Sequence, residues 1–265
     1  MIVGELINTS RKAVKQAVDE KDAVSIQRLA EEQVEAGATY VDINCGTLIE
    51  NEEETLQWLV ETVQSVVDVP LCIDTPNPAA MKAGLAICKN GQTMINSISA
   101  EKERFETMLP LVQKYKCKVV ALCMDDTGMP NSADDRYPII DKLAKDLVDG
   151  GISPDDIYFD PLVKPLSTSN QAALEVLATI QYIKKNYPEF HMICGMSNVS
   201  FGLPQRKLLN QDYLVQLMTV GMDGFILDPT DKRLMSLFFA SQALLGKDSF
   251  CVNYLQAYRA NRLVV

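Results

Sequence analysis

The sequence contains only one histidine, His191, and one tryptophan, Trp58. A single histidine argues against a metal site built from several histidines. No run of about 18 consecutive apolar residues occurs, so no membrane-spanning helix is expected. The opening MIVGELINTS lacks the basic segment and longer apolar run of a secretory signal. We therefore expect a cytoplasmic protein with no membrane partner.

Basic residues are also scarce, because 25 Lys and Arg stand against 35 Asp and Glu, for a formal net charge of −10. Nucleic-acid binding needs a clustered basic surface for phosphate contacts, so we expect no nucleic-acid partner. None of the seven cysteines belongs to a C-x-x-C pair. Most lie in apolar runs, which favours buried thiols in a reducing compartment over a redox or metal role.

Eight short apolar runs, rich in Val and Ile, alternate with amphipathic helical patterns along the 265 residues. This pattern predicts an α/β fold, a single-domain (β/α)8 TIM barrel over residues 1–265 with a final helix at 251–265. An open doubly wound sheet is the alternative, but the G-x-G-x-x-G turn that favours it is missing. The predicted strands contain Ile2–Ile7, Tyr40–Ile43, Pro70–Ile73, Met94–Ile95, Val119–Met124, Ile157–Phe159, Met192–Met196 and Gly224–Leu227.

An Asp or Asn lies at or just after the end of every predicted strand. The carboxyl ends of barrel strands converge on one mouth, so these side chains are expected to gather there. Asp and Asn also favour turns and helix N-caps, which accounts for part of the set. It accounts less well for Asp42 and Asn44, which share one face of a strand. The eight residues are Asn8, Asn44, Asp74, Asn96, Asp125, Asp160, Asn198 and Asp228.

The predicted mouth has few groups that could act as a nucleophile or move protons. His191 begins its strand and is expected at the opposite end, and no G-x-S-x-G turn is present. Paired carboxylates would suit a glycosidase, but aromatic platforms are lacking. A Mg²⁺ or Ca²⁺ site made of oxygens is an open alternative. The best chemical match is a flat heterocycle such as a pterin, whose N–H and NH2 donors beside a carbonyl can pair with Asp and Asn.

Several segments carry a family resemblance. The segment GMSNVSFGLPQRKLLN (195–210) closely resembles the motif G-x-S-N-V-S-F-G-L-P-x-R of folate-dependent methyltransferases that work with corrinoid proteins. The folate domain of cobalamin-dependent methionine synthase has a similar segment. Matching stretches cover the predicted barrel from end to end. They are GELIN (4–8), VDINCG (41–46), LCIDTPNPAAMKAGL (71–85), MINSISAEKERFE (94–106) and FDPLVKP (159–165).

The resemblance implies an enzyme of the methyltransferase class that binds tetrahydrofolate or methyltetrahydrofolate as its substrate. It implies methyl transfer between N5 of the folate and the cobalt of cobalamin, which arrives on a separate corrinoid protein. It also implies a homodimer. We assign no metal ligands, although a cation at the barrel mouth is left open. The direction of transfer is left open, as are the corrinoid partner and the ultimate methyl donor or acceptor.

The matching positions imply a role for each of seven residues. Asp74, Asn96 and Asp160 would hold the edge of the pterin. Gly195 and Ser197 would line the pocket. Asn198, the implied catalytic residue, would hydrogen-bond near N5. Arg206 would contact the polar side of the substrate or steady the Asn198 loop.

The sequence departs from the family at Asp125, where some relatives have Asn, and at Cys45, where Val is common. Three other functions are considered. A dihydropteroate synthase would need a basic cluster and an S-x-R-x-H segment, which is absent after Asn198. A zinc-dependent thiol methyltransferase would need ligands that only Cys45 and Cys194 could begin to supply. The third is a folate-binding protein without catalytic activity.

Overall fold

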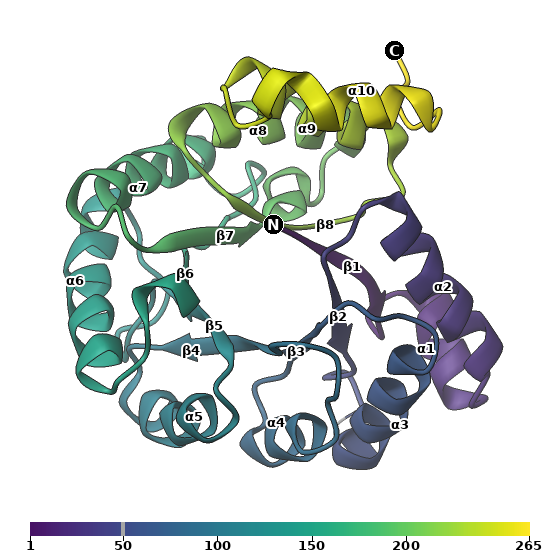
Figure 1. Cartoon of the computed structure of the whole chain (residues 1–265). Helices are drawn as coiled ribbons and strands as arrows, with labels where there is room; N and C mark the ends of the chain where they lie inside the picture. Colours follow the sequence, from purple (N-terminus) through teal and green to yellow (C-terminus); the bar gives the residue numbers. More distant parts are fainter. Residues whose placement is uncertain (49–50) are drawn as a thin grey trace.

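Eight parallel strands form a closed barrel in which each strand pairs with its neighbours in sequence and β1 pairs with β8 (Figure 1). The structure is a computed structural model that describes residues 1–48 and 51–265. All eight predicted strands are confirmed, as is the single-domain (β/α)8 barrel. The strands are β1 (Ile2–Asn8), β2 (Tyr40–Asn44), β3 (Leu71–Asp74), β4 (Met94–Ser99), β5 (Lys118–Leu122), β6 (Ile157–Asp160), β7 (His191–Gly195) and β8 (Gly224–Leu227).

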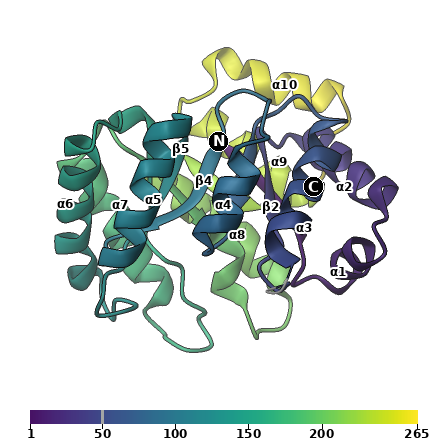
Figure 2. The same cartoon turned by 90° about the horizontal axis from the view of Figure 1, so that it is seen from below.

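The helices surround the barrel and cover its outer face (Figures 1 and 2). The α-helices are α1 (Lys12–Asp19), α2 (Ala23–Ala36), α3 (Glu52–Gln64), α4 (Pro78–Leu85), α5 (Lys102–Tyr115), α6 (Ala133–Asp149), α7 (Ala172–Asn186), α8 (Arg206–Val220), α9 (Lys232–Leu244) and α10 (Val252–Arg259). Short 3-10 helices are η2 (Pro154–Asp156), η3 (Met196–Ser200) and η4 (Ser249–Cys251). None of the described helices is long and apolar enough to cross a membrane.

Side-chain caps fix where the helices near the mouth begin. Asn77 accepts hydrogen bonds from the backbone of the first turn of α4, and Pro78 fits the next position, where no N–H partner is needed. Ser132 and Asp135 form a reciprocal capping box at the start of α6. At the other end of α2, Gly37 adopts a φ of +115°, which glycine tolerates without steric cost. The caps of α4 and α6 thus fix where loops of the mouth end, whereas Gly37 ends α2 at the opposite end of the barrel, just before β2.

The barrel interior is filled by two layers of different chemistry. The lower layer is apolar and receives one buried side chain from each of β1 to β7, namely Val3, Tyr40, Cys72, Met94, Val120, Tyr158 and Ile193. Side chains two residues further along a strand point to the same side. The next inward layer is therefore mostly polar. It contains Glu5, Asp42, Asp74, Asn96, Asp160 and Gly195, all of which line a cavity at the mouth.

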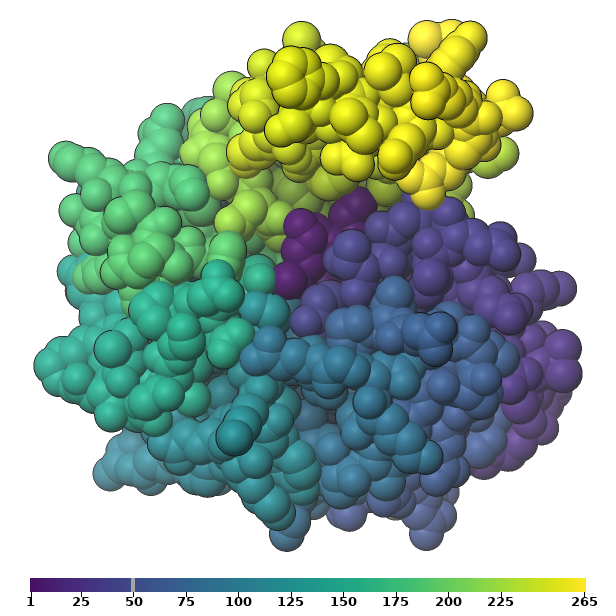
Figure 3. Space-filling model, viewed as in Figure 1, coloured from purple at the N-terminus to yellow at the C-terminus, as the bar shows by residue number. Residues whose placement is uncertain are grey.

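His191 lies at the end of the barrel opposite the mouth, as predicted, because it is the first residue of β7. Its ring lies between two carboxylates, with Nδ1 2.8 Å from Asp223 Oδ2 and Nε2 3.0 Å from Asp155 Oδ1. The ring also stacks on Tyr158. The N-terminus closes this end, since the Met1 ammonium donates to the Asp223 carbonyl. Figure 3 shows this face, with the N-terminal residues near its centre and the C-terminal segment in yellow along one edge.

The predicted C-terminal segment contains α10, which packs against α9, and the helix ends at Arg259. Residues 262–265 lie beyond the helix as irregular chain. All seven cysteines are free. Five of them are buried, and Cys251 is exposed in η4.

Candidate active site

The mouth of the barrel contains a cavity of about 500 Å³. Two other cavities, of about 570 and 550 Å³, are lined by none of the seven residues predicted for the site. The mouth cavity is lined by all seven of them: Asp74, Asn96, Asp160, Gly195, Ser197, Asn198 and Arg206. The fold therefore brings together residues that lie up to 132 positions apart in sequence, from 74 to 206.

Five of the eight strand-end Asp and Asn residues form local turns. Each accepts a hydrogen bond from the backbone N–H two residues later, so the alternative interpretation as turn formers is right for them. Two of the five, Asn8 and Asp160, also line the mouth cavity. Asp125 lines a different cavity. The five are Asn8, Asn44, Asp125, Asp160 and Asp228.

Asp74 lies at the end of β3, beside Asn96 of β4 in the paired register. Its Oδ2 accepts a 2.8 Å hydrogen bond from the Asn44 side-chain amide. Burial raises the pKa of Asp74 to about 6, while the Asn44 hydrogen bond and the Arg104 charge act in the opposite direction. Arg104 is held by the Pro76 carbonyl at 3.2 Å. The carboxyl group is thus fixed in direction and mostly ionised at pH 7.

Asp160 ends β6 and is 8% exposed. Its Oδ1 accepts the Leu162 N–H at 2.8 Å, which leaves Oδ2 without a hydrogen bond among the described residues. Burial raises the pKa of Asp160 to about 7, and the Leu162 hydrogen bond and the Arg136 charge offset part of that rise. A carboxyl group in this state can pair with ring N–H and NH2 donors once it is ionised.

Asn198 lies in η3, directly after β7, and is exposed to the cavity. No hydrogen bond to its side-chain amide occurs within the described parts of the chain. Arg206 holds the turn instead, since its Nη2 donates to the Ser197 carbonyl at 2.8 Å and its Nε donates to Ser200 Oγ at 3.0 Å. A Cβ atom added at Gly195 would lie 3.2 Å from Asn198 Nδ2. Of the two roles implied for Arg206, the contacts match the one that steadies the loop.

Two acidic residues of the mouth were not among the predicted site residues. Glu5 of β1 binds Arg11 Nη2 at 2.9 Å through Oε1, and it accepts a hydrogen bond from Ser197 Oγ at 3.2 Å through Oε2. Burial raises the pKa of Glu5. Asp42 of β2 is 2% exposed, and its Oδ1 has no partner within the described residues. A carboxyl group inside an otherwise apolar strand is the signal that singled out Asp42 in the sequence, and the same signal could have found Glu5.

The burial of Asp42 has a large electrostatic consequence. Desolvation, followed by the nearby charge of Asp74, raises the pKa of Asp42 well above its usual range. The side chains of Cys72 and Asn96 only partly offset this. The carboxyl group of Asp42 therefore holds its proton near neutral pH, which avoids the larger cost of a buried charge.

The described residues contain no group of three or more His, Cys, Asp or Glu arranged to hold a metal ion. The two cysteines considered for zinc are both buried. Burial raises the pKa of Cys45 to about 12 and the pKa of Cys194 well above its usual range. Zinc is bound by the thiolate, so binding at either cysteine would have to release this proton.

A family model described as a pterin-binding enzyme matches residues 4–228. The chain belongs to this family. Methylcorrinoid:tetrahydrofolate methyltransferase of Eubacterium limosum is 39% identical over 265 residues, which cover 99% of this chain and 97% of that one. This match confirms the predicted resemblance to folate-dependent methyltransferases of corrinoid systems. Methionine synthase of Mycobacterium tuberculosis is 26% identical over 239 residues, 85% of this chain but only 20% of that protein.

Similar solved structures include dihydropteroate synthases. The enzyme from Yersinia pestis superposes with a TM-score of 0.68 at 19% identity and covers 93% of each chain. The enzyme from Vibrio fischeri gives a TM-score of 0.67 at 18% identity, over 92% of this chain and 93% of that one. At these identities the likeness shows the barrel fold alone.

Proposed function

We propose that the chain is a methyltransferase that moves a methyl group from a methyl-corrinoid, carried by a partner protein, to N5 of tetrahydrofolate. The observation that supports this most is the polar layer of the mouth, whose described lining offers carboxylates and amides but no cysteine or histidine. The 39% identity to a methylcorrinoid:tetrahydrofolate methyltransferase supports the substrates and, by the order of its name, this direction of transfer.

The residues at the mouth fit a pterin. A pterin presents ring N–H and NH2 donors along one edge, beside a carbonyl oxygen. Asp74 and Asp160 would accept from the donors, and the Asn96 amide would pair with a donor and an acceptor at the same edge. Asp42 lies in the same polar layer, so its carboxyl group adds to the hydrogen-bonding groups around the pocket. Hydrogen bonds to ionised groups contribute about 1.5–3 kcal/mol each when sheltered from water.

Asn198 would act at N5, where the chemistry takes place. N5 uses its lone pair to form the new N–CH3 bond, and the cobalt–carbon bond breaks with its electron pair left on cobalt. N5 then releases its proton. The Asn198 side-chain oxygen can accept a hydrogen bond from N5–H. The lone pair of N5 then faces the incoming methyl group. The chain supplies position and hydrogen bonding, which are the terms that matter when both reacting atoms belong to substrates.

The direct test mixes the protein with methylcobalamin and tetrahydrofolate and follows the visible spectrum of the corrinoid. We expect loss of the methylcobalamin spectrum and formation of methyltetrahydrofolate. Asn198→Ala should slow single-turnover transfer about 10²–10³-fold, by analogy with removal of one oxyanion-hole donor, and change folate affinity little. Asn186→Ala, an exposed change on α7, is the matched control. An unchanged rate in Asn198→Ala would remove this residue from the mechanism.

Two other functions give different results in the same experiment. A folate-binding protein without activity would bind tetrahydrofolate in a calorimeter but leave methylcobalamin unchanged. A dihydropteroate synthase would form dihydropteroate from its own substrates. No contact at the mouth favours that synthase, and the single histidine lies at the opposite end of the barrel.

The proposal extends to assembly and location. The family resemblance supports a homodimer, and light scattering should then give about twice the chain mass of 29.4 kDa. The seven free cysteines and the reduced folate substrate are consistent with a cytoplasmic enzyme. Cell fractionation tests this location, and recovery with the membrane or secreted fraction would contradict it.

A further inference from the structure

A fully buried guanidinium lies behind the mouth, outside the set of residues assigned above. Arg136 projects from α6 and is 0% exposed. Its Nε donates to the Pro161 carbonyl at 2.6 Å, and its Nη2 donates to the Leu162 carbonyl at 3.3 Å. Its Nη1 donates to the Ser132 carbonyl at 2.7 Å. The planar fork of arginine is suited to such simultaneous contacts, whereas lysine carries a single ammonium group.

The turn held by Arg136 contains an unfavourable backbone conformation. Leu162 has a φ of +62°, in the left-handed region that side chains other than glycine rarely adopt. Such a residue persists when its surroundings hold it in place. Two sets of contacts hold Leu162 in this conformation. The Arg136 guanidinium donates to the carbonyls of Pro161 and Leu162, and the Leu162 N–H donates to Asp160 Oδ1 at 2.8 Å.

We propose that Arg136 is a positioning residue for Asp160. By holding the carbonyls of Pro161 and Leu162, it fixes the turn whose N–H occupies one oxygen of Asp160, and it thereby aims the other oxygen at the pterin. The ligand named here rests on the function proposed above, but the effect of Arg136 on Asp160 can be measured without any ligand.

The charges around Asp160 support the same conclusion. Arg136 acts on it from α6, and the other titratable groups that interact with it electrostatically are Cys123, Cys194 and Tyr213. Burial raises the pKa of each of these three groups, so they are neutral near pH 7. Among the described residues, Arg136 is therefore the cation that favours the ionised form of Asp160.

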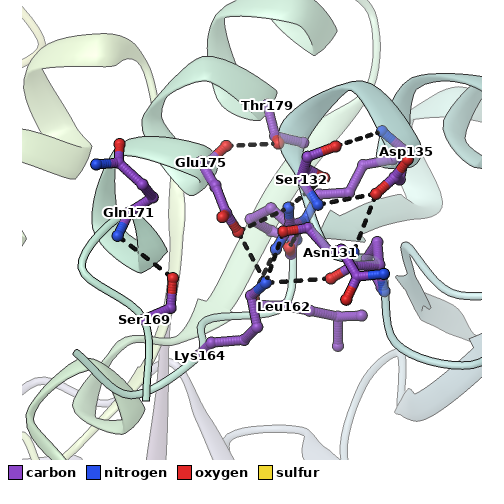
Figure 4. Close-up of polar contacts among 12 residues, drawn as sticks. Asn131, Ser132, Asp135, Leu162, Lys164, Ser169, Gln171, Glu175 and Thr179 are labelled. Atoms are coloured by element: carbon purple, nitrogen blue, oxygen red, sulfur yellow. Dashed lines mark hydrogen bonds and ion pairs between the residues drawn. The ribbon is translucent and has the colours of Figure 1, made fainter. Parts of the chain in front are cut away.

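A neighbouring pair provides a matched control. Glu175 of α7 lies 3.3 Å from Arg136 Nη1 and 2.9 Å from Lys164 Nζ. Figure 4 shows Lys164 and Glu175 pointing toward one another, close to Asn131 and Leu162. Lys164 also donates to the carbonyls of Pro130 and Asn131, but it does not contact the carbonyls that Arg136 holds. Loss of Lys164 should thus disturb the same loops without releasing the Asp160 turn.

The experiment compares wild type with Arg136→Gln, Arg136→Lys and the control Lys164→Gln. The first readout is the pKa of Asp160 in the ligand-free proteins, from NMR titration of its carboxyl carbon. The second is the Kd of tetrahydrofolate as a function of pH, by calorimetry. Arg136→Gln should raise the pKa of Asp160, weaken binding about tenfold or more at pH 7, and move the loss of binding to higher pH. Arg136→Lys keeps the charge, so it should weaken binding with a smaller change in the pH at which binding is lost.

A rescue separates positioning from general damage to the fold. Glycine adopts the conformation of Leu162 without strain, so Leu162→Gly added to Arg136→Lys should restore part of the lost affinity. This pair also keeps the test valid if Arg136→Gln does not fold. The proposal is overturned if the folded Arg136 variants match wild type in both readouts, if Lys164→Gln shifts them equally, or if Leu162→Gly worsens binding further. If wild type itself binds no tetrahydrofolate, the proposed function fails, and the ligand-free titration still decides the link between Arg136 and Asp160.

Discussion

Replacing Asp160 by Asn should make the ligand-free protein more stable while impairing folate binding. The raised pKa of Asp160 means that ionisation of this carboxyl opposes folding. The pKa rises from 3.8 to about 7, which corresponds to about 4 kcal/mol at pH 8, at about 1.36 kcal/mol per tenfold change in proton affinity. Asn carries no charge and can still accept the Leu162 N–H through its side-chain oxygen. The figure is a ceiling, because a buried amide has its own desolvation cost.

The raised pKa of Asp160 also determines how the free energy of unfolding changes with pH. Between pH 4 and pH 7 the folded state holds a proton on Asp160 that the unfolded state has lost, so wild-type stability falls as the pH rises through this window. The advantage of Asp160→Asn should therefore shrink from at most about 4 kcal/mol at pH 8 to less than about 2 kcal/mol at pH 5. Urea unfolding at the two pH values measures this difference.

Asp68→Asn is a suitable control, because Asp68 is exposed and makes no hydrogen bond within the described chain. It should leave stability nearly unchanged at both pH values. Calorimetry with tetrahydrofolate completes the test, since the amide introduced in Asp160→Asn would place a donor where the pterin needs an acceptor. The reasoning fails if Asp160→Asn is less stable than wild type at pH 8, or if its advantage is the same at pH 5.

Three further predictions concern other parts of the site and fold. Gly195→Ala should slow methyl transfer more than it weakens folate binding, because the new Cβ would lie 3.2 Å from Nδ2 of Asn198, the proposed catalytic residue. Single-turnover rates and the Kd of tetrahydrofolate separate the two effects. His191→Gln should lower the urea midpoint and leave the Kd for folate unchanged, because its two carboxylate contacts lie at the end opposite the mouth. Folate binding at pH 6.5 should release up to about one proton in total from Asp74 and Asp160, since pterin donors favour their ionised forms. Calorimetry in buffers of different ionisation enthalpy counts these protons, and proton uptake on binding would contradict the proposed recognition of the pterin.

The barrel could be predicted because its signals are local. Each strand is a short apolar run between helical patterns, and the number of units alone points to eight strands around a closed ring. Asp74 and Asp160 were two of the eight strand-end Asp and Asn residues expected at the mouth, and the family resemblance implied their role in pterin binding. Asp42 was noted for sharing a strand face with Asn44 but was not assigned to the site, and Glu5 was missed. Counting two residues on from Val3 and Tyr40 places both in the polar layer.

Other features depend on contacts between distant segments and leave little trace in the sequence. Nothing near Arg136 in the chain shows that its guanidinium reaches the turn after β6, 25 residues away. The role of Arg206 was also left open by the motif, because its two hydrogen bonds to the Ser197–Ser200 turn depend on how α8 begins. Such contacts follow from the path of the loops, which local patterns do not determine.

The composition of the mouth is hard to explain by folding alone. An apolar layer fills the lower barrel, and a second apolar layer above it would be more stable than buried carboxyl groups. Instead, burial raises the pKa of Glu5, Asp42, Asp74 and Asp160 together. A ligand that brings several donors on one rigid edge would relieve this cost at once, and its binding energy would then fix the orientation of the rest of the ring. That is what a methyl transfer without a protein nucleophile requires, because the rate depends on how well the two substrates are aligned.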